Sequence, residues 1–173
     1  MINPSRPDQP DRAEHRMERT YEIDVTPEQV WDAIATAEGI STWMVPTRLD
    51  QQTGGEVSFD HGDFVSNGYV TDYSPPRRFA YEEPWPMTEE MRDWVATVAG
   101  HEPPTDHDLS LLTPIATEFL VESASGGSCV IRVVTSAFGS GADWENEFFA
   151  EMVDGWASIL DNLVKLLEEA SQG

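Results

Sequence analysis

The chain has 173 residues, enough for one ordinary domain, and 39% of them are hydrophobic. Acidic residues outnumber basic ones by 32 to 10, and the formal net charge of −22 repels nucleic acid and anionic membrane surfaces, so both are excluded as main partners. The single cysteine, Cys129, allows no intrachain disulfide, and no segment is apolar over a membrane-spanning length. We therefore expect a soluble, cytoplasmic protein.

The start of the chain predicts a leader followed by a strand. Residues 1–15 are polar and contain three prolines, a composition typical of disorder. Residues 16–25 alternate loosely between polar and apolar side chains, which indicates a β-strand. We therefore expect a disordered leader over 1–15 and a single domain over 16–173.

Two short helices are expected after this strand. Thr26 is a suitable N-cap, Pro27 suits the first helical position, and Gln29 completes a capping box. This helix is expected to end near Ala37. A second short helix is expected over 38–43, where the chain then reaches a Met-Val-Pro sequence that stops it.

Short apolar runs separated by turn residues predict an antiparallel meander that forms most of the domain. The strands are expected at residues 47–50, 56–60, 64–73, 77–83, 115–123 and 128–137. The first strand of the chain and the last can pair, which gives a curved sheet of about six or seven strands. Such a sheet buries one face against a helix, so the fold class is α+β.

Residues 84–114 form a long excursion between two of these strands. The pattern over 88–99 fits a short helix, and 101–113 is expected to be irregular loop. Two histidines and two aspartates lie close together in this insertion, but a metal site would require several of them to converge from a loop. We favour solvated loop residues and expect neither a metal nor another cofactor.

The last segment, residues 144–170, predicts a helix of roughly seven turns with a wide apolar stripe. Leu160, Leu163 and Leu167 are expected to close the core. Glu145 projects onto the same face, close to the start of the helix. It either overhangs into water or places a polar group at the mouth of an apolar pocket, and both interpretations stay open.

Four segments in this order resemble a known superfamily. They are Val25–Ala33 with Glu38–Trp43, Gly54–Phe59, Gly68–Tyr81, and Gly155-Trp156 followed by Leu160 and Leu163. Together they resemble the START-like, helix-grip superfamily known as SRPBCC, and most of all its branch named for activators of the heat-shock-protein-ninety ATPase. The resemblance implies a helix-grip fold, in which a curved antiparallel sheet wraps around a long C-terminal helix.

A helix-grip fold places a cavity between the sheet and the final helix, and the aromatic residues of this chain are placed to line it. We expect a non-catalytic protein that binds a small apolar or aromatic molecule there. The expected ligand-binding residues are Trp43, Phe59, Phe79, Tyr81, Trp85, Phe119, Glu145, Phe148, Met152 and Trp156. Substitution of Glu145 by Gln is expected to alter ligand binding and to leave stability nearly unchanged.

Two alternatives to this function stay open. One is a cyclase- or hydrolase-like enzyme that uses a cavity carboxylate as general base, which a carboxylate of raised pKa deep in the pocket would favour. The other is a protein-interaction domain with a chaperone partner, which the family resemblance alone implies. A homodimer formed through an edge strand or the insertion also stays open.

Overall fold

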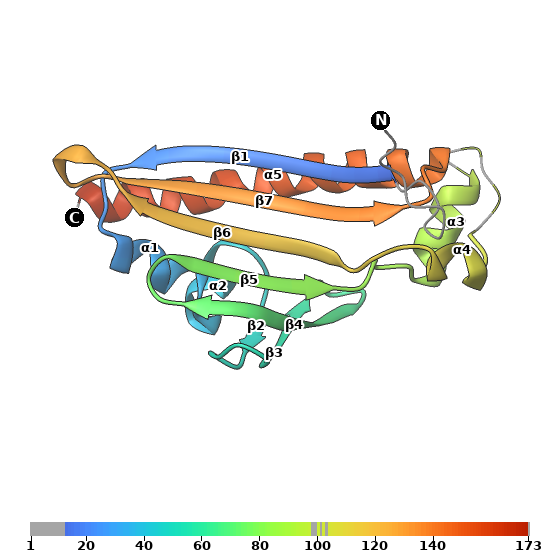
Figure 1. The fold of residues 1–173 in the computed structure, drawn as a ribbon, viewed down its shortest axis with the longest axis horizontal. Helices are drawn as coiled ribbons and strands as arrows, with labels where there is room; N and C mark the ends of the chain where they lie inside the picture. The colour runs from blue at the N-terminus through green and yellow to red at the C-terminus, as the bar shows by residue number, and fades with distance from the viewer. Residues whose placement is uncertain (1–12, 98–99, 101, 103, 173) are drawn as a thin grey trace, which may run out of the picture.

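The structure is a computed structural model that describes residues 13–97, 100, 102 and 104–172. Its strands and helices follow the predicted order closely (Figure 1). In chain order they are β1 (Ala13–Ile23), α1 (Pro27–Ile34), α2 (Ala37–Trp43), β2 (Thr47–Leu49), β3 (Glu56–Asp60), β4 (Val65–Ser74), β5 (Arg78–Glu83), α3 (Glu89–Thr97), α4 (Asp106–Ser110), β6 (Ile115–Ser123), a 3-10 turn (Ser125–Gly127), β7 (Cys129–Gly139) and α5 (Asp143–Gln172).

The seven strands form one antiparallel sheet in the order β1-β7-β6-β5-β4-β3-β2. The predicted pairing of the first and last strands is confirmed, because β1 pairs with β7 along its whole length, from Ala13 opposite Gly139 to Ile23 opposite Cys129. The long helix α5 lies behind the sheet and follows the length of β1 and β7 (Figure 1). The α+β helix-grip fold is therefore the observed one.

The N-terminal boundary differs from the prediction. Residues 1–12 of the expected leader lie outside the described residues, but residues 13–15 belong to β1. His15 is 6% exposed, because the strand carries it between the sheet and the start of α5. The residues around His15 are polar, so the sequence pattern did not indicate a buried strand position there. The first strand begins at Ala13, before the predicted start of the domain at residue 16.

The predicted cap of α1 is present, and α2 is capped as well. The Thr26 hydroxyl accepts a hydrogen bond from the Gln29 backbone N–H, and the Gln29 side chain accepts one from the Thr26 N–H in return. Thr36 caps α2 in the same position, through the Gly39 N–H. The Trp43 ring at the end of α2 donates to the Ala33 carbonyl, which ties the two helices together over one end of the sheet.

The core forms between the inner face of the sheet and the stripe of α5. Leu160, Leu163 and Leu167 are at most 2% exposed, so the expectation that they close the core is confirmed. Cys129 is buried as well, and its thiol donates to the Val25 carbonyl, as expected for an inert structural cysteine.

The insertion contains two helices rather than one. The expected helix is α3, and a second helix, α4, occupies part of the segment predicted to be irregular. Thr105 caps α4, because its hydroxyl accepts from the Asp108 N–H and the Asp108 carboxylate accepts from the Thr105 N–H. The sequence pattern Thr-x-x-Asp is a capping box with aspartate in place of glutamate, which explains the missed helix.

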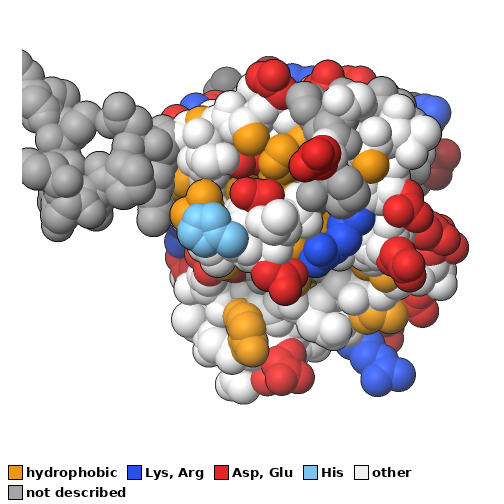
Figure 2. Space-filling view, turned by 90° about the vertical axis from the view of Figure 1, so that its right-hand side faces the viewer, with side chains coloured by type: hydrophobic (Ala, Val, Ile, Leu, Met, Phe, Trp, Pro, Cys, Tyr) orange, Lys and Arg blue, Asp and Glu red, His pale blue; other side chains and the backbone are white. Residues whose placement is uncertain are grey.

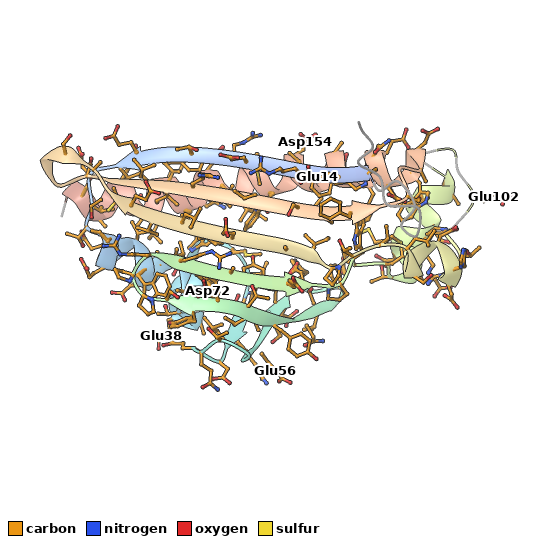
Figure 3. The ribbon with its side chains drawn as sticks, in the orientation of Figure 1. Glu14, Glu38, Glu56, Asp72, Glu102 and Asp154 are labelled. Atoms are coloured by element: carbon orange, nitrogen blue, oxygen red, sulfur yellow. The ribbon has the colours of Figure 1, made fainter. Side chains whose placement is uncertain are left out.

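Exposed acidic side chains come from several elements of the fold. The labelled Glu14, Glu38, Glu56 and Asp154 come from four different elements and point away from the core (Figure 3). At the end of the molecule that carries α3 and α4, more acidic than basic side chains are visible, with single hydrophobic side chains between them (Figure 2). Among the described residues, every helix is too short or too polar to cross a membrane.

Candidate functional site

A cavity of about 590 Å³ lies between the inner face of the sheet, α3 and α5. Its size is in the range of small-molecule sites in proteins. Its walls are formed by Met44, His61, Phe64, Ser66, Tyr81, Glu83, Pro86, Glu90, Met91, Trp94, Ile115, Thr117, Thr135, Phe148, Glu151, Met152, Gly155, Trp156 and Ile159. Most of these side chains are apolar, and several are aromatic.

One wall of the cavity is the N-terminal half of α5. Phe148, Met152 and Trp156 line it at a spacing of four residues, so they lie above one another on one helix face. Gly155 lies on the same side of the helix, is exposed, and lines the rim of the cavity. A Cβ added to Gly155 would meet nothing within 4 Å. The helix therefore leaves an open position at the edge of its aromatic wall.

The sheet forms a floor that carries hydroxyl groups. Thr117 of β6 and Thr135 of β7 are cross-strand partners, and their Oγ1 atoms lie 3.4 Å apart. The Trp156 indole Nε1 donates to Thr135 Oγ1 at 3.1 Å, which connects the helix wall to the floor. Next to them, burial raises the pKa of the Tyr81 hydroxyl far above its ordinary value, while nearby Glu83 adds to the rise.

Glu83 carries the most unusual group of the cavity. Its position at the end of β5 continues the alternation of Phe79 and Tyr81, so its side chain lies on the inner face of the sheet. Among the residues that the structure describes, Glu83 Oε2 is the one buried side-chain oxygen or nitrogen without a hydrogen-bond partner. Burial raises the pKa of this carboxyl from 4.5 to about 7, although a hydrogen bond with Ser66 opposes the rise.

The third wall comes from the insertion. Met91 and Trp94 of α3 line the cavity opposite α5, and the Trp94 ring meets the edge of Phe148 at a centroid distance of 6.4 Å. Glu90 of α3 and Glu151 of α5 line the cavity as well, and both are exposed, so they lie at its rim. The helix α3 of the insertion therefore contributes one wall of the cavity.

Four of the predicted ligand-binding residues line this cavity, namely Tyr81, Phe148, Met152 and Trp156. Trp43, Phe59, Phe79 and Phe119 do not, because they pack into the core next to the lining residues Tyr81 and Trp156. There the short helices supply rings that fill the space. Trp31 of α1 meets Phe79 at 6.4 Å, and Trp43 of α2 meets Phe119 at 6.3 Å.

Trp85 also lies outside the lining of the cavity. Its ring is 8% exposed and packs among Trp144, Phe148 and Phe149 behind the cavity wall. The indole N–H donates to the Thr113 carbonyl at 2.8 Å, which joins the two ends of the insertion. This contact fixes Trp85 in the core, so the residue supports the wall from outside.

Glu145 does not face the cavity, and neither interpretation of it from the sequence is correct. The residue is 0% exposed and lies between the start of α5, β1 and the turn after β7. Its Oε1 accepts from the Gly141 N–H at 3.1 Å and lies 3.1 Å from His15 Nε2. Its Oε2 accepts from both the hydroxyl and the backbone N–H of Ser140.

These hydrogen bonds stabilise a buried charge on Glu145. Burial by itself would raise the pKa of the carboxyl, but the hydrogen bonds from Ser140, His15 and Gly141 together hold the pKa below its ordinary value. Gly139 leaves the necessary space, because a Cβ at that position would lie 2.1 Å from Glu145 Oε1. These contacts indicate a structural role for Glu145, so we now expect Glu145→Gln to lower stability.

Two other candidate groups lie away from the cavity. Arg78 pairs with Asp72 of β4 and Glu118 of β6, which gives it a structural role. His101 of the histidine and aspartate group in the insertion lies outside the described residues. Among those described, groups of three or more histidine, cysteine or acidic side chains that could hold a metal ion are absent.

The comparison with protein families gives one match. The sequence model of the family described as "Activator of Hsp90 ATPase homolog 1-like protein" matches residues 24–168. This range begins directly after β1 and covers β2 to β7, the insertion and almost all of α5. No curated protein matches the sequence.

Several solved structures share the fold. Protein MLL2253 from Mesorhizobium loti is 15% identical, with a TM-score of 0.64 over 89% of this chain and 97% of the other. The Aha1 dimer from Colwellia psychrerythraea is 17% identical, with a TM-score of 0.62 over 88% and 96%. Protein SA2116 from Staphylococcus aureus is 12% identical, with a TM-score of 0.66 over 94% and 99%. At these identities the likeness is one of fold.

Proposed function

The chain belongs to the family of activator of Hsp90 ATPase homolog 1-like proteins, and on this premise we propose that it binds a small apolar or aromatic molecule without changing it chemically. The binding site is the cavity between the sheet, α3 and α5. The observation that supports this proposal best is the cavity itself, with its volume of about 590 Å³ and its aromatic walls.

The walls fit such a ligand because they combine flat and adaptable side chains. Phe148 and Trp156 offer aromatic faces, while Met152 and Met91 on opposite walls can adapt to the shape of a ligand. The hydroxyl floor offers a small number of polar contacts. In this proposal Tyr81, Phe148, Met152 and Trp156, which were predicted from the sequence, act together with α3.

Screening a small-molecule library by native mass spectrometry and thermal shift tests the proposal. We expect apolar and aromatic compounds to bind one per chain and to raise the melting temperature. Gly155→Trp should abolish binding, because it places a large ring at the open rim position. Gly155→Ala is the matched control and should bind like the wild type. Binding that survives in Gly155→Trp would show that the ligand lies elsewhere.

A second function is favoured by one observation, the carboxyl of Glu83 with its pKa of about 7. A carboxyl that titrates near neutral pH inside an apolar cavity is suited to act as general base or general acid. In an enzyme of this kind, Glu83 would move a proton on the bound molecule. Mass spectrometry of the compounds recovered after incubation separates the two functions, because a binding protein returns its ligand unchanged.

The predicted chaperone partner and the homodimer concern the outer surface. The family name suggests a partner of this kind, and the Aha1 protein from Colwellia psychrerythraea, which forms a dimer, suggests the homodimer. Size-exclusion chromatography with light scattering measures the oligomeric state directly. Co-elution with a purified chaperone of the Hsp90 class would support the interaction role, and we expect it to leave the cavity free.

A further inference from the structure

We propose that the cavity ligand is an organic cation, an apolar or aromatic body that carries a protonated amine, and that the Glu83 carboxylate anchors the ammonium group. This inference rests on the proposed binding function and adds the chemical class of the ligand. It is carried by three features of the cavity: the sign of its charges, the unpartnered oxygen of Glu83, and the aromatic rings around it.

The charged groups of the cavity have one sign. Three glutamates line it, Glu83 inside and Glu90 and Glu151 at the rim, and the described lining residues include neither lysine nor arginine. The one lining histidine, His61, adds little positive charge, because partial burial lowers its pKa more than nearby Asp60 raises it. Such a site attracts a cation and repels a carboxylate or phosphate ligand.

One carboxyl oxygen of Glu83 lacks the partner that buried polar groups normally have. Its Oε2 is sealed from solvent and forms no hydrogen bond with any described residue. Buried polar groups are nearly always paired, so an orphaned carboxyl oxygen at a cavity wall indicates a group that is still missing. The terminal torsion of glutamate is broad, so a small rotation presents Oε2 to the cavity. An ammonium group there would supply both the hydrogen bond and the opposite charge.

The aromatic walls suit the same ligand. Tyr81, Trp94, Phe148 and Trp156 surround the cavity from three elements. Cations bind to aromatic faces as well as to carboxylates, and the attraction is larger where water is excluded. The apolar part of the ligand would pack on these rings while its amine lies at Glu83. The rim acids Glu90 and Glu151 would guide the cation into the cavity.

Binding of the cation exchanges a proton. At neutral pH the Glu83 carboxyl is partly protonated, and it loses this proton as the ammonium binds. Ser66 of β4 forms a hydrogen bond with Glu83, and Tyr81 of β5 lies close enough for the two charges to interact. The other titratable groups that line the same cavity are Glu90 of α3, Glu151 of α5 and His61, whose pKa is lowered by burial. The affinity should therefore increase as pH rises through 7, until the amine itself begins to lose its proton.

Three indole compounds test the charge preference by isothermal titration calorimetry at pH 7.5. Tryptamine is a cation, tryptophol is neutral and indole-3-acetate is an anion, while the ring is the same. We expect tryptamine to bind about tenfold more tightly than tryptophol and indole-3-acetate to bind weakest. Glu83→Gln should remove the advantage of tryptamine and leave tryptophol unchanged. The matched control is Glu82→Gln on the same strand, which removes the same charge from the opposite, exposed face.

The outcomes separate this inference from the proposed function. If tryptophol binds as tightly as tryptamine and Gly155→Trp blocks both, the cavity function stands and the cation inference is wrong. If Glu82→Gln weakens tryptamine as much as Glu83→Gln does, the effect is general electrostatics and Glu83 is no anchor. If none of the three compounds binds, the cation inference is wrong, and the library screen then decides on the cavity function.

Discussion

Glu145 and Glu83 both lie inside the domain, yet their surroundings shift the pKa of the carboxyl in opposite directions. Glu145 accepts hydrogen bonds from Ser140 and Gly141 and lies beside His15, so its charge is stabilised although it is 0% exposed. Glu83 has one oxygen buried without a partner, and burial destabilises its charge. A carboxylate with all its partners holds the fold together, while one without a partner is available to a ligand.

The largest expected effect comes from removing the satisfied carboxylate. Glu145→Ala should lower the free energy of unfolding by about 3 kcal/mol, because it leaves His15 and the Ser140 and Gly141 N–H groups buried without an acceptor. Urea denaturation followed by circular dichroism measures this loss. Asp154→Ala on the exposed side of the same helix is the control and should change stability by less than about 0.5 kcal/mol. Equal effects of the two variants would contradict a structural role for Glu145.

The raised pKa of Glu83 predicts that the free energy of unfolding decreases as pH rises, which is opposite to the effect of a carboxyl with a lowered pKa such as Glu145. Between pH 4.5 and about 7 the folded protein holds a proton on Glu83 that the unfolded chain has released. The free energy of unfolding therefore decreases as pH rises through this window, by up to about 3 kcal/mol. Glu83→Gln should lack this decrease and should be more stable than the wild type at pH 8. Parallel curves for the two proteins between pH 4.5 and 8 would contradict the assignment.

Gly139 provides a second test of the role of Glu145, because it leaves the space that the Glu145 carboxylate occupies. Gly139→Ala should lower stability by about 2 kcal/mol, because the new Cβ would lie 2.1 Å from Glu145 Oε1 and 2.9 Å from Leu112 Cδ2. Chemical denaturation of a double-mutant cycle checks the cause. In the Glu145→Ala background most of this cost should disappear, and additive costs would show that the two residues do not interact.

The smallest effect is expected at the rim of the cavity. Gly155 lies inside α5, and a Cβ there meets nothing within 4 Å. Gly155→Ala should therefore raise the free energy of unfolding by about 0.5–1 kcal/mol through helix propensity. Thermal unfolding with and without a ligand measures both effects, and we expect unchanged affinity. A loss of stability would show that the position is not open.

The same two glutamates show how far the sequence could predict the site. The period of α5 correctly placed Glu145 on the inner face, but its partners come from elsewhere, and His15 is 130 residues away in the chain. Helical periodicity predicts the direction of a side chain, but it does not predict which residues contact that side chain. The resemblance and the alternation of the strands were enough for the sheet order and the long helix, because these patterns are local or shared by the family.

Glu83 was missed although a signal was present. Phe79, Tyr81 and Glu83 alternate along β5, which places the glutamate on the inner face with the two rings. The sequence could not show that Oε2 would lack a partner, because that depends on the side chains of four other elements. The predicted wall residues Phe79 and Phe119 do not line the cavity, because Trp31 of α1 and Trp43 of α2 pack against them. These contacts also depend on residues that are distant in the sequence.

The most direct test of the account is an NMR titration of the glutamate side-chain carboxyl carbons, with Glu83 and Glu145 assigned from Glu83→Gln and Glu145→Gln. We expect Glu83 to titrate with a midpoint of about 7 and Glu145 to titrate below its ordinary pKa of 4.5. Addition of tryptamine should shift the Glu83 midpoint downward and leave that of Glu145 in place. Midpoints near 4.5 for both carboxyls would contradict the account.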